Sequence, residues 1–189
     1  MRITDPLTMR ALAHPLRLDL LELLSIEGPL TAAQSGQILG IGQANCSFHL
    51  RQLAKYGLVE EAPRGADRRE RPWRVVDVEQ SWSSVSPDAA SRHLDVVMAQ
   101  READRRMRWV AAREMESPEW RQAGFFGGAT VPLTATELED LGDSLRALIE
   151  PYVERITDKE IRPSGARPVR VLLGGTPLTA WDESQEVTA

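Results

Sequence analysis

The chain has 189 residues, enough to bury one large core or two small ones, and its composition is ordinary for a globular protein. Its single cysteine, Cys46, excludes an intrachain disulfide and a cysteine-rich metal cluster. No apolar run approaches the length of a membrane span, and the N-terminal residues lack the pattern of a secretory signal. We therefore expect a cytoplasmic protein.

The net charge of −5 is distributed unevenly along the chain. Residues 1–78 hold ten Lys or Arg against nine Asp or Glu, whereas residues 79–189 hold thirteen against nineteen. Within the first part, residues 62–74 contain five arginines and two acidic residues. The acidity belongs to the C-terminal part, so it does not argue against a nucleic-acid partner for the N-terminal part.

Three helices are predicted before residue 40. A short one covers Leu7–Ala13, and a second runs from Pro15, which suits the first turn of a helix, to about Ile26. Thr31 is a good N-cap for a third helix over Ala32–Leu39, and glycines on either side of Ile41 permit a sharp turn after it.

A fourth helix is predicted over Gln43–Tyr56. Cys46, Leu50 and Leu53 share one face at helical spacing and should point to the core. Polar side chains near the N-terminal end of the other face suit base edges in a DNA major groove, and the basic ones further along suit phosphates. The residues of this helix that we expect to contact DNA are Gln43, Ala44, Asn45, Ser47, Phe48, Arg51 and Lys55.

Two strands joined by an arginine-rich loop are predicted after Gly57. The order of two helices around a tight turn, then a basic hairpin, is that of a winged helix-turn-helix, in which the wing grips the DNA backbone or minor groove. The wing residues expected to contact DNA are Arg64, Arg68, Arg69 and Arg71. The alternative, that this is an ordinary solvated loop, is less favoured beside a helix-turn-helix.

The N-terminal part resembles the ArsR family of dimeric winged-helix repressors. The resemblance is carried by the segments AHPLRLDLLELL and SFHLRQLAKYGLVE, within which the motif residues are Ser47, His49, Leu50, Leu53, Gly57, Leu58 and Val59. The Trp120 region, the segment LTATELEDL and the final RPVRVLL are similar to a larger branch of that family with a helical C-terminal extension. The resemblance implies a dimer that binds double-stranded DNA.

The resemblance does not extend to metal sensing. Many members bind metal through a Cys-x-Cys pair on the helix before the recognition helix, but TAAQSGQIL contains no thiol. His93 and Asp95 are the only remnant of a second kind of metal site, and no later histidine completes a tetrahedral set. We expect no metal and no cofactor.

A long helix is predicted from Ser86 to about Met115. Its apolar stripe could build a dimer interface, which would place two recognition helices about one DNA turn apart. Packing within the same chain is the alternative, and the family resemblance favours the dimer. The predicted dimerisation residues are Val96, Ala99, Ala103, Met107 and Val110.

Three further elements are predicted toward the C-terminus. A short helix starts at Ser117–Pro118, and the capping box Thr134-x-x-Glu137 starts a longer one that Pro151 should kink or break. Residues 169–173 are predicted to be a strand that pairs with residues 130–133.

Other distinctive residues have two interpretations. The aromatic residues could line a pocket for a small apolar effector, although core packing is favoured; they are Trp73, Trp82, Trp109, Trp120, Phe125 and Phe126. His49 is more often a packed residue than a base reader at such a position, and Cys46 is more often a core residue than a redox switch.

The predicted fold class is mostly α with a small β component: a winged helix-turn-helix domain at 1–78, a helical dimerisation and effector region at 79–180, and a mobile tail at 181–189. The predicted function is a sequence-specific, DNA-binding transcriptional regulator, a homodimeric repressor of ArsR type that uses no metal. A winged-helix module that binds another protein instead of DNA is the alternative. No nucleophile-base set and no phosphate-cradling loop is present in the sequence, so we expect no enzyme.

Overall fold

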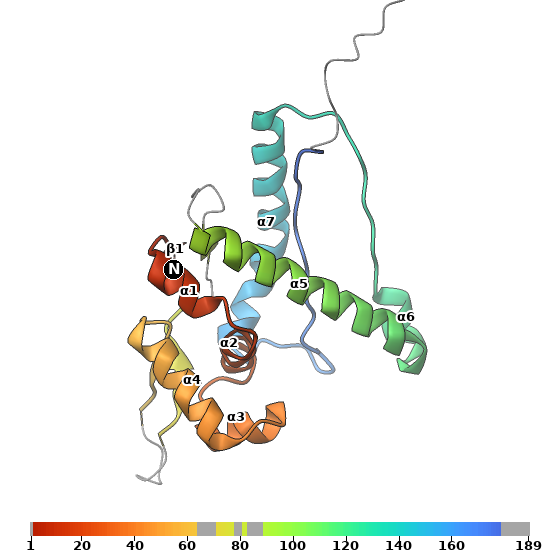
Figure 1. Ribbon diagram of the computed structural model, residues 1–189. Helices are drawn as coiled ribbons and strands as arrows, with labels where there is room; N and C mark the ends of the chain where they lie inside the picture. The colour runs from red at the N-terminus through yellow and green to blue at the C-terminus, as the bar shows by residue number, and fades with distance from the viewer. Residues whose placement is uncertain (1, 64–70, 78–80, 83–88, 179–189) are drawn as a thin grey trace, which may run out of the picture. The chain divides into compact units, whose positions relative to one another are not determined.

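The computed structural model describes residues 2–63, 71–77, 81–82 and 89–178 of the chain (Figure 1). Its contacts divide it into two compact units, one of Met1–Phe125 with Arg155–Ala166 and one of Phe126–Glu154 with Arg167–Ala189. The division does not fall at residue 78, because the long helix after it packs against the N-terminal helices. The functional division at residue 78 stays a prediction.

The first unit begins with four helices at the predicted positions. They are α1 (Pro6–Leu12), α2 (Pro15–Glu27), α3 (Ala32–Leu39) and α4 (Gln43–Lys55). Prolines stand in the first turns of α1 and α2, where their missing N–H groups are not needed. Gly28, at φ 80°, ends α2 in a conformation that favours glycine.

A hairpin follows α4, as predicted. Strands β2 (Val59–Glu61) and β3 (Trp73–Val75) pair antiparallel, with Glu60 opposite Arg74 and Glu61 opposite Trp73. Two further pairings were not predicted: Leu30 bridges to Trp73 ahead of α3, and β1 (Arg2–Ile3) pairs in parallel with β4 (Ser81–Trp82). The mostly helical fold with a small antiparallel sheet is that of a winged helix-turn-helix.

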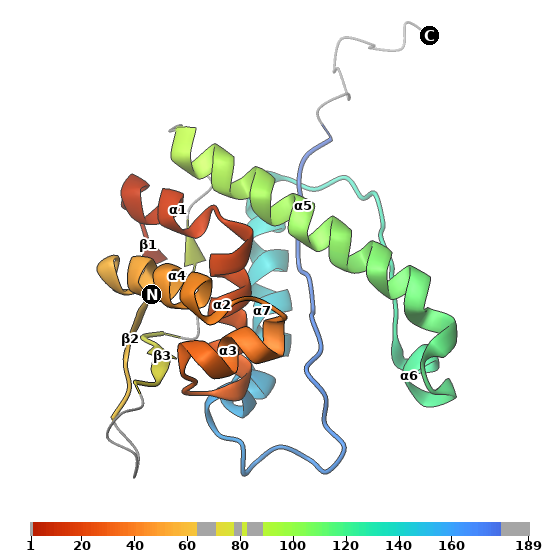
Figure 2. The ribbon, with the colours of Figure 1, turned by 60° about the horizontal axis from the view of Figure 1, so that its bottom comes forward.

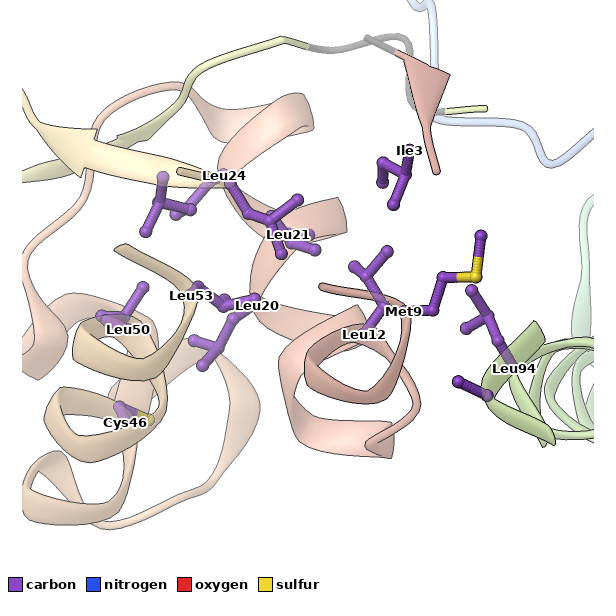
Figure 3. Packing of buried hydrophobic residues seen from close by; sticks show 13 residues of the cluster. Ile3, Met9, Leu12, Leu20, Leu21, Leu24, Cys46, Leu50, Leu53 and Leu94 are labelled. Carbon is purple, nitrogen blue, oxygen red and sulfur yellow. The ribbon is translucent and has the colours of Figure 1, made fainter. Parts of the chain in front are cut away.

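The core of this unit lies between α1, α2, α4 and the start of the next helix, α5 (Ala89–Ala112). Figure 3 shows Leu20, Leu50 and Leu53 facing one another across α2 and α4, and Met9 and Leu94 meeting between α1 and α5. Each of these five side chains is at most 1% exposed. Tight burial of aliphatic side chains from four helices is what fixes their mutual positions.

Helix α5 crosses α1 and continues into a short 3-10 turn, η1 (Arg113–Met115), and then α6 (Pro118–Ala123), which begins where predicted (Figure 2). An ionic network also joins α5 to α2: Arg101 pairs with Asp19 and Glu22, and Arg105 pairs with the same Glu22. The side chain of Arg101 is only 13% exposed, so this network is better shielded from solvent than a typical surface ion pair.

Helix α7 (Ala135–Thr157), up to Glu154, is the helix of the second unit. Thr134 and Glu137 form the predicted capping box, with the Thr134 N–H donating to the Glu137 carboxylate at 2.8 Å. Of the two alternatives predicted at Pro151, a kink or a break, the break does not occur, because the helix continues through that residue. A helix can accommodate an internal proline when the hydrogen bond lost is solvated or replaced.

The predicted pairing of residues 169–173 with residues 130–133 is also wrong. Both segments are described and neither forms a strand. Their side chains are exposed, including Val131 at 54% and Val169 at 64%. Alternating apolar residues indicate a strand only where a neighbouring strand and a covered face are available, and the described part of the chain provides neither here. The predicted tail at 181–189 lies outside the described residues.

Candidate nucleic-acid interface

The turn between α3 and α4 is set by local capping and by one close approach. Thr31 accepts a hydrogen bond from the Gln34 N–H, and the Gln34 side chain accepts one from the Thr31 N–H, which fixes the start of α3. Gly40 ends the helix at φ 68°. The Ile41 N–H donates to the Gly36 carbonyl at 2.9 Å, and a Cβ on Gly36 would lie 2.5 Å from the Ile41 oxygen.

Helix α4 presents one face to the core and one to solvent. Cys46, Leu50 and Leu53 are fully buried, as predicted. On the other side, Phe48 is 51% exposed. Of the other predicted DNA-contacting residues of α4, Ser47 is half-buried. The rest are exposed: Gln43, Ala44, Asn45, Arg51 and Lys55.

An open depression of about 390 Å³ lies between the start of α3, the outer face of α4 and the hairpin. It brings together four of the predicted DNA-contacting residues, because Gln43, Ser47 and Arg51 follow one another along α4 at intervals of four and Arg71 lies on the hairpin side. The other predicted residues of α4 do not line it. The described residues that line this groove are Thr31, Ala32, Ala33, Gln43, Ser47, Arg51, Glu61, Arg71 and Trp73.

Five lining residues were not among the predicted contacts. Thr31 is the N-cap of α3, and Ala32 and Ala33 begin the helix, whose positive end favours an anion; the N-cap signal at Thr31 could have indicated this. Trp73 had been named only as an aromatic residue that could line an effector pocket, and Glu61 carried no signal, since only the pairing of the hairpin brings the two to the groove.

The hairpin carries two ion pairs. Arg74 pairs with Glu60 at 2.6 Å and Arg71 pairs with Glu61 at 3.4 Å, all four side chains being well exposed. The other predicted wing residues, Arg64, Arg68 and Arg69, lie outside the described residues.

A histidine pair lies beneath α4. His49 is 8% exposed and stacks on His14, with ring centroids 4.4 Å apart. Burial lowers the pKa of both imidazoles, and Arg17 lowers them further through its charge. The Nδ1 atoms of both rings and Nε of Arg17 are buried, and no described residue offers them a hydrogen-bond partner. His49 is therefore a packed residue, as predicted, and is not available to read bases.

The structure also bears on the other residues singled out in the sequence. Trp73 is partly buried and packs against the core, as favoured. Cys46 is completely buried, and burial raises the pKa of its thiol, as expected for a core residue. Phe125 and Phe126 are 83% and 56% exposed, so the favoured core packing is wrong for both. The side chain of Trp82 lies outside the described residues.

Within the described part of the chain, no three His, Cys, Asp or Glu side chains are grouped so that they could hold a metal ion. Of the described helices, none combines the length and the apolar character that crossing a bilayer requires.

Comparison with known proteins matches the segment that contains α3 and α4. Residues 12–62 fit the family model described as a helix-turn-helix domain. This segment is a helix-turn-helix domain. It covers α2, α3, α4 and β2, and the last three of these contribute residues to the lining of the groove. No curated protein matches the chain.

Solved structures show only distant likeness. A mutant of ZitR from Lactococcus lactis is 16% identical, with 73% of this chain and 74% of that chain covered and a TM-score of 0.36. The adhesin competence repressor of Streptococcus pyogenes is 14% identical over 74% and 81%, with a TM-score of 0.37. The PcaV regulator of Streptomyces coelicolor is 19% identical over 74% and 76%, with a TM-score of 0.35. Likeness this distant carries no ligand or binding site over to this chain.

Proposed function

We propose that this protein is a sequence-specific DNA-binding transcriptional regulator, a homodimeric repressor of ArsR type that does not use a metal. The observation that carries the proposal is the groove, in which polar and basic side chains of the exposed face of α4 stand opposite an arginine of the hairpin within a helix-turn-helix domain. A helix presented in this way fits the major groove of DNA, and the hairpin fits the backbone beside it.

The residues divide into two roles. Gln43, Asn45 and Ser47 lie in the first two turns of α4, where side chains reach base edges, so they would specify sequence. Arg51 lies further along, where an arginine meets phosphates, and Arg71 reaches the groove from the hairpin. The arginines would add affinity that falls with salt, whereas the polar side chains would decide which base pairs are preferred.

The test is selection of bound sequences from a random DNA pool, followed by titration of the selected duplex. Gln43→Ala should change the preferred sequence and cost about 1–3 kcal/mol on the selected site. Arg51→Ala should weaken binding to every duplex and reduce the salt slope by about 0.9. Arg113→Ala, in the short turn η1 that follows α5, is the control and should do neither. Failure to enrich any sequence would refute the assignment.

The dimer is supported by the predicted stripe on α5. The opposite side of α5 packs on the core through Leu94 and Met98 and on α2 through Arg101. The stripe itself is exposed, with Val96 at 67% and Met107 at 66%. The other three residues of the stripe are also exposed: Val110 at 54%, and Ala99 and Ala103 on the same side of the helix. An exposed apolar stripe of this kind suits a second copy related by a two-fold axis.

Sedimentation of the purified protein tests the dimer. Met107→Glu should place a charge in the interface and raise the dimer dissociation constant at least tenfold. Met115→Glu is the control, because Met115 is 89% exposed and lies outside the stripe. A wild-type protein that sediments as a monomer at working concentrations would remove the dimer from the proposal.

A second candidate function is recognition of another protein by the same face of α4. Phe48 favours it, because an aromatic side chain that is 51% exposed is typical of a protein interface as well as of contact with a thymine methyl. Phe48→Ala separates the two candidates. A loss of DNA affinity confined to sites with thymine supports contact with DNA, and unchanged DNA affinity supports a protein partner.

A further inference from the structure

One acidic side chain stands in the groove. Of the described residues that line it, Glu61 alone is negatively charged, and it shares the lining with Arg51, Arg71 and the first turn of α3. Its Oε1 atom lies 3.4 Å from Nη1 of Arg71. Two arginines and a helix N-terminus attract an anion, and this carboxylate supplies negative charge to them in the free protein.

The neighbouring Glu60 provides the contrast. Successive side chains of a strand point to opposite faces, and Glu60 pairs with Arg74 without lining the groove. The two glutamates are therefore equal in charge and adjacent in sequence, and both are about half exposed, at 48% for Glu60 and 43% for Glu61. They differ in which face of the hairpin they occupy.

The pairing of Glu61 with Arg71 is of a kind that a stronger anion can replace. The separation of 3.4 Å is long for a charge-assisted hydrogen bond, and Arg71 is 66% exposed, so water already competes for it. A DNA phosphate that approaches the same arginines would have to displace the carboxylate or be repelled by it. Either event reduces the affinity for the backbone and affects all sequences alike.

We propose that Glu61 is an internal substitute for a DNA phosphate: it occupies Arg71 in the free protein and limits the affinity of the groove for the DNA backbone. The inference rests on the proposed DNA-binding function and deepens it. Removing the Glu61 carboxylate frees Arg71 for one additional phosphate contact. Removing the Glu60 carboxylate changes only the electrostatic potential around the hairpin.

The test compares Glu61→Gln with Glu60→Gln by fluorescence anisotropy on the selected duplex and on an unrelated duplex, over a range of NaCl concentrations. Glu61→Gln should tighten binding to both duplexes roughly tenfold and steepen the salt slope by about 0.9, which corresponds to one more phosphate contact. Glu60→Gln should tighten binding by less than about threefold, through screened charge alone. Arg71→Ala should cost more affinity in the Glu61→Gln background than in the wild type.

Equal effects of the two glutamine variants would overturn the inference while leaving the proposed function intact. Weaker or less selective binding by Glu61→Gln would also overturn it, because Glu61 would then be a base-contacting residue. If neither the wild type nor any variant binds a duplex at low salt, the proposed function itself fails and takes this inference with it. Thermal unfolding midpoints of both variants should match that of the wild type, since both ion pairs are exposed.

Discussion

Replacing Gly36 by alanine tests the close approach that sets the angle between α3 and α4. A Cβ at this position would meet the backbone oxygen of Ile41 at 2.5 Å, and a backbone atom cannot turn aside as a flexible side chain can. Forcing extra volume into a packed site costs about 1–3 kcal/mol. An alanine within a helix, however, contributes about 1 kcal/mol relative to glycine. We therefore expect a net loss of up to about 2 kcal/mol in the free energy of unfolding.

Gly142, inside α7, is the matched control for this substitution. A Cβ there meets nothing closer than the Arg146 side chain at 3.6 Å, so Gly142→Ala should raise stability by up to about 1 kcal/mol. Urea unfolding followed by circular dichroism measures both variants, and DNA titration should show weaker binding for Gly36→Ala alone. If both alanines stabilise the protein to the same degree, α3 and α4 do not approach each other as described.

Three further outcomes follow from the structure. Burial lowers the pKa values of His14 and His49, so below pH 6.5 the unfolded chain binds protons more readily than the folded one. The stability that these residues contribute should therefore be fully present above pH 6.5 and fall below it. Urea unfolding midpoints from pH 7.5 to 5 measure this, and a flat profile would contradict it. Arg101→Ala should lower the free energy of unfolding by about 1.5–3 kcal/mol, because its partners on α2 lose a shielded cation. Arg146→Ala, whose ion pair is exposed, should lower it by under about 0.5 kcal/mol, and urea unfolding measures both variants. The buried Cys46, whose thiol pKa is raised, should react with a thiol reagent only at the rate of unfolding; immediate labelling of the native protein would show that the core is open at α4.

Much of the local structure followed from the sequence because its causes are local. A capping box is four residues long, so Thr31 and Gln34 were enough to locate α3, and the same holds for Thr134 and Glu137 at the start of α7. The spacing of Cys46, Leu50 and Leu53 likewise identified the buried face of α4 and, by exclusion, its open face.

The misjudged elements depended on partners that a local pattern does not contain. Val169 and Val171 alternate as strand residues do, yet the described part of the chain offers no neighbouring strand to pair with them. Phe125 is a large aromatic residue, yet none of the described elements covers it, and it is 83% exposed.

By itself, the sequence determined where α1 to α4 begin and end and which side of α4 is apolar, because hydrogen bonds and side-chain periodicity over a few residues decide both. Only the tertiary structure decided which side of α5 packs on α2 and which stays open, and only it placed Glu61 of the hairpin in one groove with Arg51 of α4. Those arrangements arise from contacts between residues distant in sequence, and the packing of the whole core selects among the pairings that local patterns leave equal.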